Sequence, residues 1–312
     1  MALSNVGAAI HERSLAGMLA GIQYAEKAGV RSAWLTTGAG PDALMVFAAA
    51  AATTTSIHMG TAIVPIYPRH PIVVAQQVAD IWSLAPGRLT LGIGPSHGPQ
   101  VEGRFGLKYE RPLEHVREFT GVLKGLLSGA EVDHQGKHYK LKASLFGPAP
   151  APVINSALRE RSFELAGEVA DGAVTWLCPA PYLKRVAVPA LERGSQIAGR
   201  PRQRLYGHAF VCLTEDRDAL LKAVGESLGH YPRLPNYQEM FVQAGYPEAR
   251  EAKFSDGMID AVVLHGSERT ATDKVHQFLD ESGCDDLLLS VTVAGDDRTA
   301  ALHRTLDWIG GL

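Results

Sequence analysis

The chain has 312 residues, 46% of them apolar, which is enough to bury the core of one large domain or of two small ones. Its formal net charge of −3 gives no electrostatic footprint for nucleic acid or for an anionic membrane surface, so neither is expected as a partner. Cys178, Cys212 and Cys284 lie too far apart to suggest a zinc motif or a disulfide framework, which predicts no metal site and a reducing, cytoplasmic location.

Eight short apolar runs, most of them followed by a helical pattern, succeed one another along the chain. Apolar side chains at helical spacing are seen, for example, at Val116, Phe119, Leu123 and Leu126. Strands that alternate with helices favour parallel pairing, and eight such units predict a single (β/α)8 barrel domain over residues 1–312. The predicted strands are Asn5–Ile10, Ser32–Leu35, Ile57–Val64, Leu89–Ile93, Pro152–Asn155, Gly172–Leu177, Tyr206–Leu213 and Asp286–Val291.

Two segments exceed what a minimal barrel needs. Glu131–Tyr139, between the fourth and fifth runs, predicts a hairpin that turns at Gln135-Gly136. Gly229–Val263, between the seventh and eighth runs, is rich in Pro, Tyr and Gly. Long structured insertions of this kind form lids or substrate walls, or they serve packing and dimer contacts, and the pattern leaves both uses open.

The fourth run ends in Gly92-Ile93-Gly94, which Ser96 and His97 follow. A Rossmann dinucleotide fingerprint is disfavoured, because the next glycine has the wrong offset and Pro95 and Pro99 obstruct an immediate helix. We interpret the two glycines as positions where the backbone approaches a flat ring closely. Polar side chains just beyond a barrel strand are typical of an active site.

A family resemblance rests on many short segments taken in their joint order. Together they resemble the bacterial luciferase-like superfamily, in the branch that uses the deazaflavin coenzyme F420. The segments are Gly60–Pro65, Pro68–Pro71, Ala75–Gln77, Gly87–Gly94, Arg111-Pro112, Arg117-Glu118, Leu165–Gly167, Ala170–Gly172 and Leu234–Tyr237.

The resemblance implies a bulge beneath the cofactor ring at Ala62, Ile63 and Val64, with a cis peptide between Ala62 and Ile63. It places Thr37 and Gly94 at the ring, together with Ser96 and His97. His97 would be a catalytic proton donor near neutral pH, or it would only line the pocket and bind the cofactor.

The resemblance also implies that the cofactor's phosphate tail meets the end of the fifth strand. Free N–H groups at the start of a helix bind phosphate well, so the segment from Ser156 through Ala157 and Leu158 to Arg159 would hold the tail. Ser156 would add a hydroxyl to this site and Arg159 a guanidinium. The alternative is that Ser156 is an ordinary helix N-cap. Trp176, at the end of the sixth strand, faces either the core or the cofactor.

The chain departs from the family at Gly38, where many relatives carry a histidine. The loss of that acid/base group disfavours sugar-phosphate dehydrogenation and favours reduction of an activated C=C or C=N bond. The prediction is an F420-dependent oxidoreductase that acts on a small organic substrate. The alternatives are an FMN-dependent monooxygenase and a flavin-binding barrel without turnover. By resemblance, a homodimer forms through Ala43–Ala52 and Val73–Leu84. The apolar run Ala43–Ala52 is too short to span a membrane.

Overall fold

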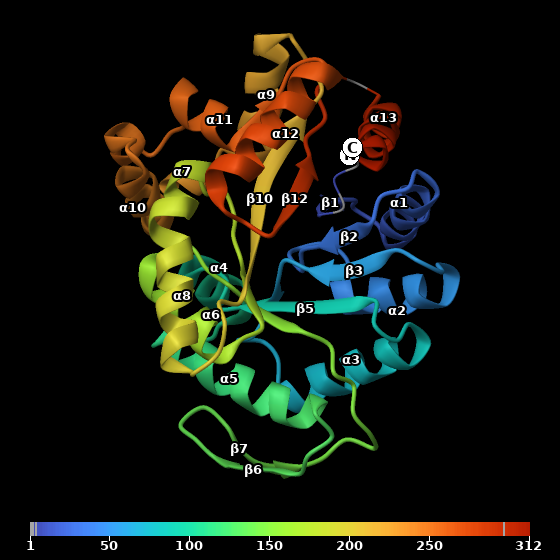
Figure 1. Cartoon of the computed structure of the whole chain (residues 1–312), viewed down its shortest axis with the longest axis vertical. Helices are drawn as coiled ribbons and strands as arrows, with labels where there is room; N and C mark the ends of the chain where they lie inside the picture. The colour runs from blue at the N-terminus through green and yellow to red at the C-terminus, as the bar shows by residue number, and fades with distance from the viewer. Residues whose placement is uncertain (1–2, 4, 296) are drawn as a thin grey trace.

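Eight parallel strands close into a barrel in the computed structural model, which describes residue 3 and residues 5–295 and 297–312 (Figure 1). Each strand pairs with the next in chain order, and β10 closes the ring because it pairs with both β9 and β12. The predicted (β/α)8 barrel is confirmed, and each predicted run overlaps one barrel strand. The strands are β1 (Val6–Ala9), β2 (Ser32–Leu35), β3 (His58–Thr61), β5 (Leu89–Gly94), β8 (Val153–Ser156), β9 (Gly172–Val174), β10 (Arg204–Cys212) and β12 (Asp286–Val291).

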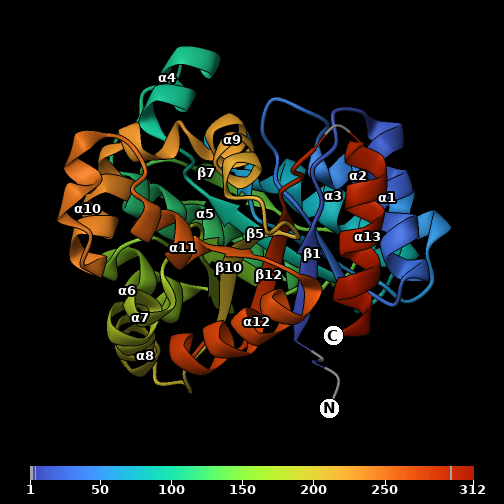
Figure 2. The same ribbon diagram turned by 90° about the horizontal axis from the view of Figure 1, so that it is seen from above.

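Helices surround the barrel and bury their apolar stripes against it (Figures 1 and 2). Local sequence sets where they begin: the side chains of Asp42 and Ser267 accept backbone N–H groups at the starts of α2 and α12, and Pro71 opens α3. The outer helices are α1 (Leu15–Lys27), α2 (Ala43–Thr53), α3 (Pro71–Leu84), α5 (Pro112–Leu127), α6 (Glu160–Val169), α8 (Val188–Ile197), α9 (Arg217–Leu228), α12 (Glu268–Ser282) and α13 (Arg298–Gly311).

The first insertion is the predicted hairpin, displaced toward the C-terminus. Its strands are β6 (Val132–Gln135) and β7 (Lys140–Ala143), so the turn lies at residues 136–139 and the hairpin extends beyond Tyr139. The carboxylate of Glu118, on α5, accepts the backbone N–H groups of His138 and Tyr139. The position of the turn is therefore set by a tertiary contact as well as by Gly136.

The second insertion is helical and ends in an extra strand. It consists of η2 (Tyr231–Arg233), α10 (Pro235–Ala244), η3 (Pro247–Glu251) and α11 (Asp256–Val262). The extra strand, β11 (Val263–His265), pairs in parallel with residues 210–212 of β10, beyond the residues that pair with β9, and was not predicted. Three further short helices are α4 (Gly98–Phe105), α7 (Ala180–Tyr182) and η1 (Leu183–Ala187), and Figure 2 shows α4 projecting on the side opposite to the two chain ends.

Side chains fill the interior of the barrel, so a ligand can only meet it at an end. A buried cluster contains Trp34, Tyr206 and Leu288 together with smaller residues. A Cβ added at Gly60 would lie 2.3 Å from the Trp34 ring, so that position accepts only glycine while the indole fills the barrel. In barrels of this kind the functional end is the one at which the strands terminate.

Candidate functional site at the barrel mouth

The chain leaves the regular sheet immediately after β3. Residues Ala62 and Ile63 interrupt the predicted third strand, and β4 (Val64–Pro65) resumes pairing with β5. The Ala62–Ile63 peptide is cis, as the resemblance implies. The end of β2 holds this bulge: the Thr36 hydroxyl donates to Ala62 O at 2.7 Å, and Thr37 N donates to Ile63 O at 3.1 Å.

Three predicted cofactor residues meet at the bulge. A Cβ added at Gly94 would lie 2.0 Å from Ser156 Oγ and 3.4 Å from Ile63 Cδ1, so these residues come from three neighbouring strand ends and pack without space between them. Ala62 is buried, whereas Ile63 and Ser156 are half-buried. The result is an apolar surface with a hydroxyl at its edge, which fits a flat aromatic ring whose polar groups lie on its rim.

Ser96 and His97 connect β5 to α4. Ser96 has a φ of 60°, in the left-handed region that is costly for a non-glycine residue, and such positions cluster at functional sites. Its hydroxyl donates to Gln100 Oε1 at 3.0 Å, and its carbonyl accepts the Tyr109 hydroxyl at 3.2 Å. Pro99 lies in the first turn of α4, where proline is well tolerated, so this proline begins a helix that it was expected to obstruct.

The imidazole of His97 is enclosed by aromatic rings from the second insertion. Its ring centroid lies 5.7 Å from that of Tyr237 and 6.4 Å from that of Tyr231, both edge-on. Burial, with a smaller contribution from His230, lowers the pKa of His97 below its usual value. His97 is therefore mostly neutral at pH 7, and its ability to release a proton depends on its minor protonated form.

The N–H groups expected to bind a phosphate are already engaged. Ala157 N donates to Val174 O, and Leu158 N and Arg159 N both donate to Ser162 Oγ. Helix α6 begins after Arg159, so the alternative that Ser156 is an N-cap is wrong. Within the described residues Ser156 Oγ and the Arg159 guanidinium have no hydrogen-bond partner, and these two side chains remain to meet an anion.

Thr37 has a local structural role. Its hydroxyl accepts the N–H of Ala43 at 3.2 Å at the start of α2, and the hydroxyl proton is left to donate elsewhere. Gly38, where relatives carry a histidine, is half-buried, and a Cβ added there would meet no atom within 4 Å. The missing side chain therefore leaves open space.

Two histidines and a serine that the sequence reasoning missed lie at the same end of the barrel. His208, on β10, and His11, just after β1, both direct Nε2 toward Ser290 Oγ on β12, at 2.7 Å and 3.3 Å. Trp176 stacks on the His208 ring at 3.8 Å and meets His11 edge-on at 6.3 Å. The signal was the strict alternation along the seventh strand, where Tyr206, His208 and Phe210 share one face.

His11 is an exposed residue, and its imidazole contacts Ser290 and Trp176 on its protein side. Burial lowers the pKa of His11 from 6.5 to about 4, and burial with a smaller contribution from His11 lowers the pKa of His208 well below 6.5, so both rings are neutral at pH 7. The barrel mouth is therefore an aromatic, imidazole-rich site.

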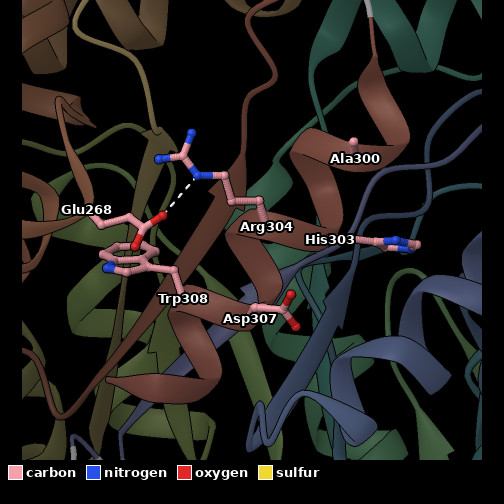
Figure 3. A pocket seen from close by; sticks show the side chains of 6 residues that line it. All are labelled: Glu268, Ala300, His303, Arg304, Asp307 and Trp308. Carbon is pink, nitrogen blue, oxygen red and sulfur yellow. Dashed lines mark hydrogen bonds and ion pairs between the residues drawn. The ribbon is translucent and has the colours of Figure 1, made fainter.

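A groove elsewhere on the molecule does not share these features. It holds about 580 Å³ between α12 and α13, where Arg304 pairs with Glu268 and the Trp308 indole donates to Thr272 (Figure 3). Within the described residues no group of three or more His, Cys, Asp or Glu side chains could hold a metal ion. Nor is any helix in the described part of the chain long and apolar enough to cross a membrane.

Comparison with known proteins places this barrel in a family. The profile of the family described as "Luciferase-like monooxygenase" matches residues 1–286. The chain belongs to this family. A similar luciferase-like chain, an uncharacterized protein of Mycobacterium tuberculosis, is 30% identical over 238 residues, which are 71% of this chain and 70% of that protein.

One further relative and one solved structure of the same fold have functional names. The 5,10-methylenetetrahydromethanopterin reductase of Methanolobus tindarius is 29% identical over 202 residues, or 63% of this luciferase-like chain and 61% of the reductase. Among solved structures, an F420-dependent secondary alcohol dehydrogenase in complex with an F420-acetone adduct matches with a TM-score of 0.82 over 98% of both chains, at 19% identity. At that identity the structural match shows a shared fold alone.

Proposed function

We propose that this protein is an F420-dependent oxidoreductase that transfers hydride between the reduced deazaflavin and a small organic substrate with an activated C=C or C=N bond. The observation that carries the proposal is the junction of Ile63, Gly94 and Ser156, an apolar surface built from three strand ends. The F420-dependent dehydrogenase of the same fold and the reductase relative support it. The absence of an acid/base side chain at Gly38 favours reduction over sugar-phosphate oxidation.

The chain's own residues would bind and orient the cofactor. Ala62, Ile63 and Val64 would support one face of the ring, with Gly94 allowing the close approach and Thr37 and Ser96 at the rim. Ser156 and Arg159 would bind the phosphate tail beside Ala157 and Leu158. The deazaflavin, when bound, supplies the hydride chemistry. Trp176 and the tyrosines of the second insertion would keep water from the reacting face.

His97 would exchange a proton with the substrate. Burial and His230 lower the pKa of His97, so the imidazole is a better proton acceptor than donor at pH 7. Reduction of the substrate would therefore use the small fraction of His97 that is protonated, and its rate would rise as the pH falls. Oxidation of a substrate in the reverse direction would use the neutral form directly.

The alternative function is FMN-dependent monooxygenation on the same barrel, which the family's description favours. The further alternative is a barrel that binds a flavin without turnover. Visible spectra separate these: an F420 enzyme oxidises the reduced deazaflavin when substrate is added, whereas a monooxygenase consumes oxygen with reduced FMN. A protein that binds either cofactor and oxidises neither would be non-catalytic.

The deciding experiment is titration of the purified protein with F420 and, separately, with FMN, followed by tryptophan fluorescence. Trp176 lies at the proposed site, whereas Trp308 lies in the groove between α12 and α13. We expect saturable quenching by F420 that the Trp176→Phe variant weakens and the Trp308→Phe variant leaves unchanged. Saturable quenching by FMN alone would instead favour the FMN-dependent monooxygenase as the function of this protein.

We also propose a homodimer through α2 and α3. Met45 on α2 and Val73 and Leu84 on α3 are 59%, 48% and 53% exposed, a high value for large apolar side chains on neighbouring helices. Light scattering should give twice the chain mass of 33.4 kDa, and Met45→Glu should shift it toward the monomer. A monodisperse wild-type monomer would contradict this proposal.

A further inference from the structure

The Ser290 hydroxyl joins two neutral imidazoles, and it has only one proton to give. His11 Nε2 and His208 Nε2 both lie within hydrogen-bond distance of Ser290 Oγ, which has no other hydrogen-bond partner within the described residues. The hydroxyl proton therefore finds an acceptor only if one of these nitrogens accepts it while the other carries a proton and donates to Oγ. The tautomers of the two rings are therefore opposite. If His208 is protonated on Nε2, His11 is protonated on Nδ1, and the reverse pairing is the other solution.

The surroundings of His208 decide between the two solutions. Its side chain is 0% exposed, and its Nδ1 has no hydrogen-bond partner within the described residues. The ring is held between the face of Trp176 at 3.8 Å and the edge of Phe210 at 4.8 Å. A buried N–H without an acceptor is rarer in proteins than a buried acceptor without a donor. His208 therefore carries its proton on Nε2 and donates it to Ser290 at 2.7 Å, within the range of an N–H···O bond.

The assignment of His208 also determines which nitrogen of His11 carries the proton. Ser290 donates its hydroxyl proton to His11 Nε2, and the remaining proton of the neutral ring lies on Nδ1. No hydrogen-bond partner for Nδ1 of His11 occurs within the described residues, and His11 is exposed to solvent whereas His208 is fully buried. The three residues therefore present one N–H donor at an aromatic mouth in which both rings are uncharged.

We propose that His11 binds the substrate, that its Nδ1–H donates to the carbonyl oxygen or imine nitrogen of an uncharged compound, and that Ser290 and His208 are positioning residues that fix this tautomer. The inference rests on the proposed function, since it names the substrate class of the same site. An N–H donor beside the hydride-accepting bond would polarise that bond and stabilise the charge that develops on its heteroatom. The low pKa of His11 keeps its ring neutral, which suits an uncharged substrate better than a phosphate or carboxylate.

The first test needs neither cofactor nor turnover. Long-range 1H–15N spectra of the full chain labelled with [15N]histidine report which ring nitrogen carries the proton. Spectra of the His11→Gln and His208→Gln variants assign the signals. We expect a proton on Nδ1 of His11 and on Nε2 of His208, and Ser290→Ala should relax His11 toward a mixture of tautomers while Ser290→Thr keeps it fixed. A wild-type His11 protonated on Nε2 would overturn the proposal.

The second test measures recognition of the acceptor atom. Cyclohex-2-en-1-one and cyclohexene differ by one carbonyl group, and their binding is followed by tryptophan fluorescence with and without saturating oxidised F420. One net hydrogen bond corresponds to about tenfold in Kd, so the enone should bind about tenfold more tightly. His11→Gln retains a contact to Ser290 without the Nδ1 donor and should abolish the preference. His11→Asn, which keeps a donor near the Nδ1 position, should retain part of it, and His303→Gln in the groove of Figure 3 should have no effect.

The outcomes separate this inference from the function on which it rests. If F420 binds and the wild type does not prefer the enone, the inference fails and the proposed function stands. If F420 does not bind but the enone preference depends on His11, the function fails and the donor site stands. Equal preference in the wild type and in His11→Gln overturns the role of His11 in either case.

Discussion

Replacing Gly94 with alanine should distort the proposed cofactor-binding surface, because the added methyl group would displace its neighbours Ser156 and Ile63. The new Cβ would lie 2.0 Å from Ser156 Oγ, 3.0 Å from Ser156 Cβ and 3.4 Å from Ile63 Cδ1. Rotation of the Ser156 hydroxyl relieves the first contact but not the second, so β5 and β8 must separate at their ends. Overpacking of this kind costs about 1–3 kcal/mol, and a displaced Ile63 should lower the affinity for F420 by roughly tenfold.

The assay is urea unfolding combined with F420 titration over a double-mutant cycle. Ser156→Gly removes both close atoms, so we expect the double variant Gly94→Ala/Ser156→Gly to recover most of the lost stability, with a coupling free energy of about 1–2 kcal/mol. Gly121→Ala on the exposed side of α5 is the matched control, because no atom lies within 4 Å of the added Cβ and alanine favours a helix by about 0.5–1 kcal/mol. Wild-type stability and F420 affinity in Gly94→Ala would refute the reasoning.

Three further predictions concern the mouth and the hairpin. Ala62→Leu should abolish F420 binding, because Ala62 is buried beneath the proposed ring, and unchanged affinity would rule out the bulge as its support. The rate of substrate reduction should rise as the pH falls toward the lowered pKa of His97, and a pH profile that His97→Gln leaves intact would remove it as the acid. Burial and the neighbouring His138 lower the pKa of His115 from 6.5 to about 4, so its neutral form stabilises the fold above pH 6.5 and this contribution is lost as the pH falls toward 4. His115→Gln can retain a hydrogen bond to Tyr139 but has no group that titrates in this range. Between pH 6.5 and pH 4 its free energy of unfolding, measured in urea, should therefore fall by on the order of 2 kcal/mol less than that of the wild type.

The barrel was predictable because each of its strands is a buried run with a helix after it. Runs such as Leu89–Ile93 are buried on both faces and carry no charged residue, as a strand covered by helices on one side and by the barrel interior on the other requires. The three residues of β11 were missed because so short a strand has no readable period within a segment that is otherwise helical. The hairpin was displaced because contacts with Glu118 set its turn, and such contacts leave no local pattern.

The site was predictable only where it follows a strand directly. Ser96, His97 and Ser156 could be placed at strand ends from the sequence, and Gly94 could be assigned to a close approach. The pairing of His11 with His208 through Ser290 joins residues up to 279 positions apart, and no spacing rule connects them. The engagement of the Leu158 and Arg159 N–H groups by Ser162 likewise depends on one side-chain rotamer.

The second insertion has a consequence for how this barrel can diversify. The proposed cofactor surface is built at the ends of β3, β5 and β8, whereas the rings that enclose His97 come from Tyr231 and Tyr237, in a helical segment between β10 and β11. Sequence change in residues 229–262 can therefore alter the surroundings of His97 without disturbing the residues proposed to hold the cofactor. A library of variants confined to that segment would sample new substrate preferences while the proposed cofactor site stays unchanged.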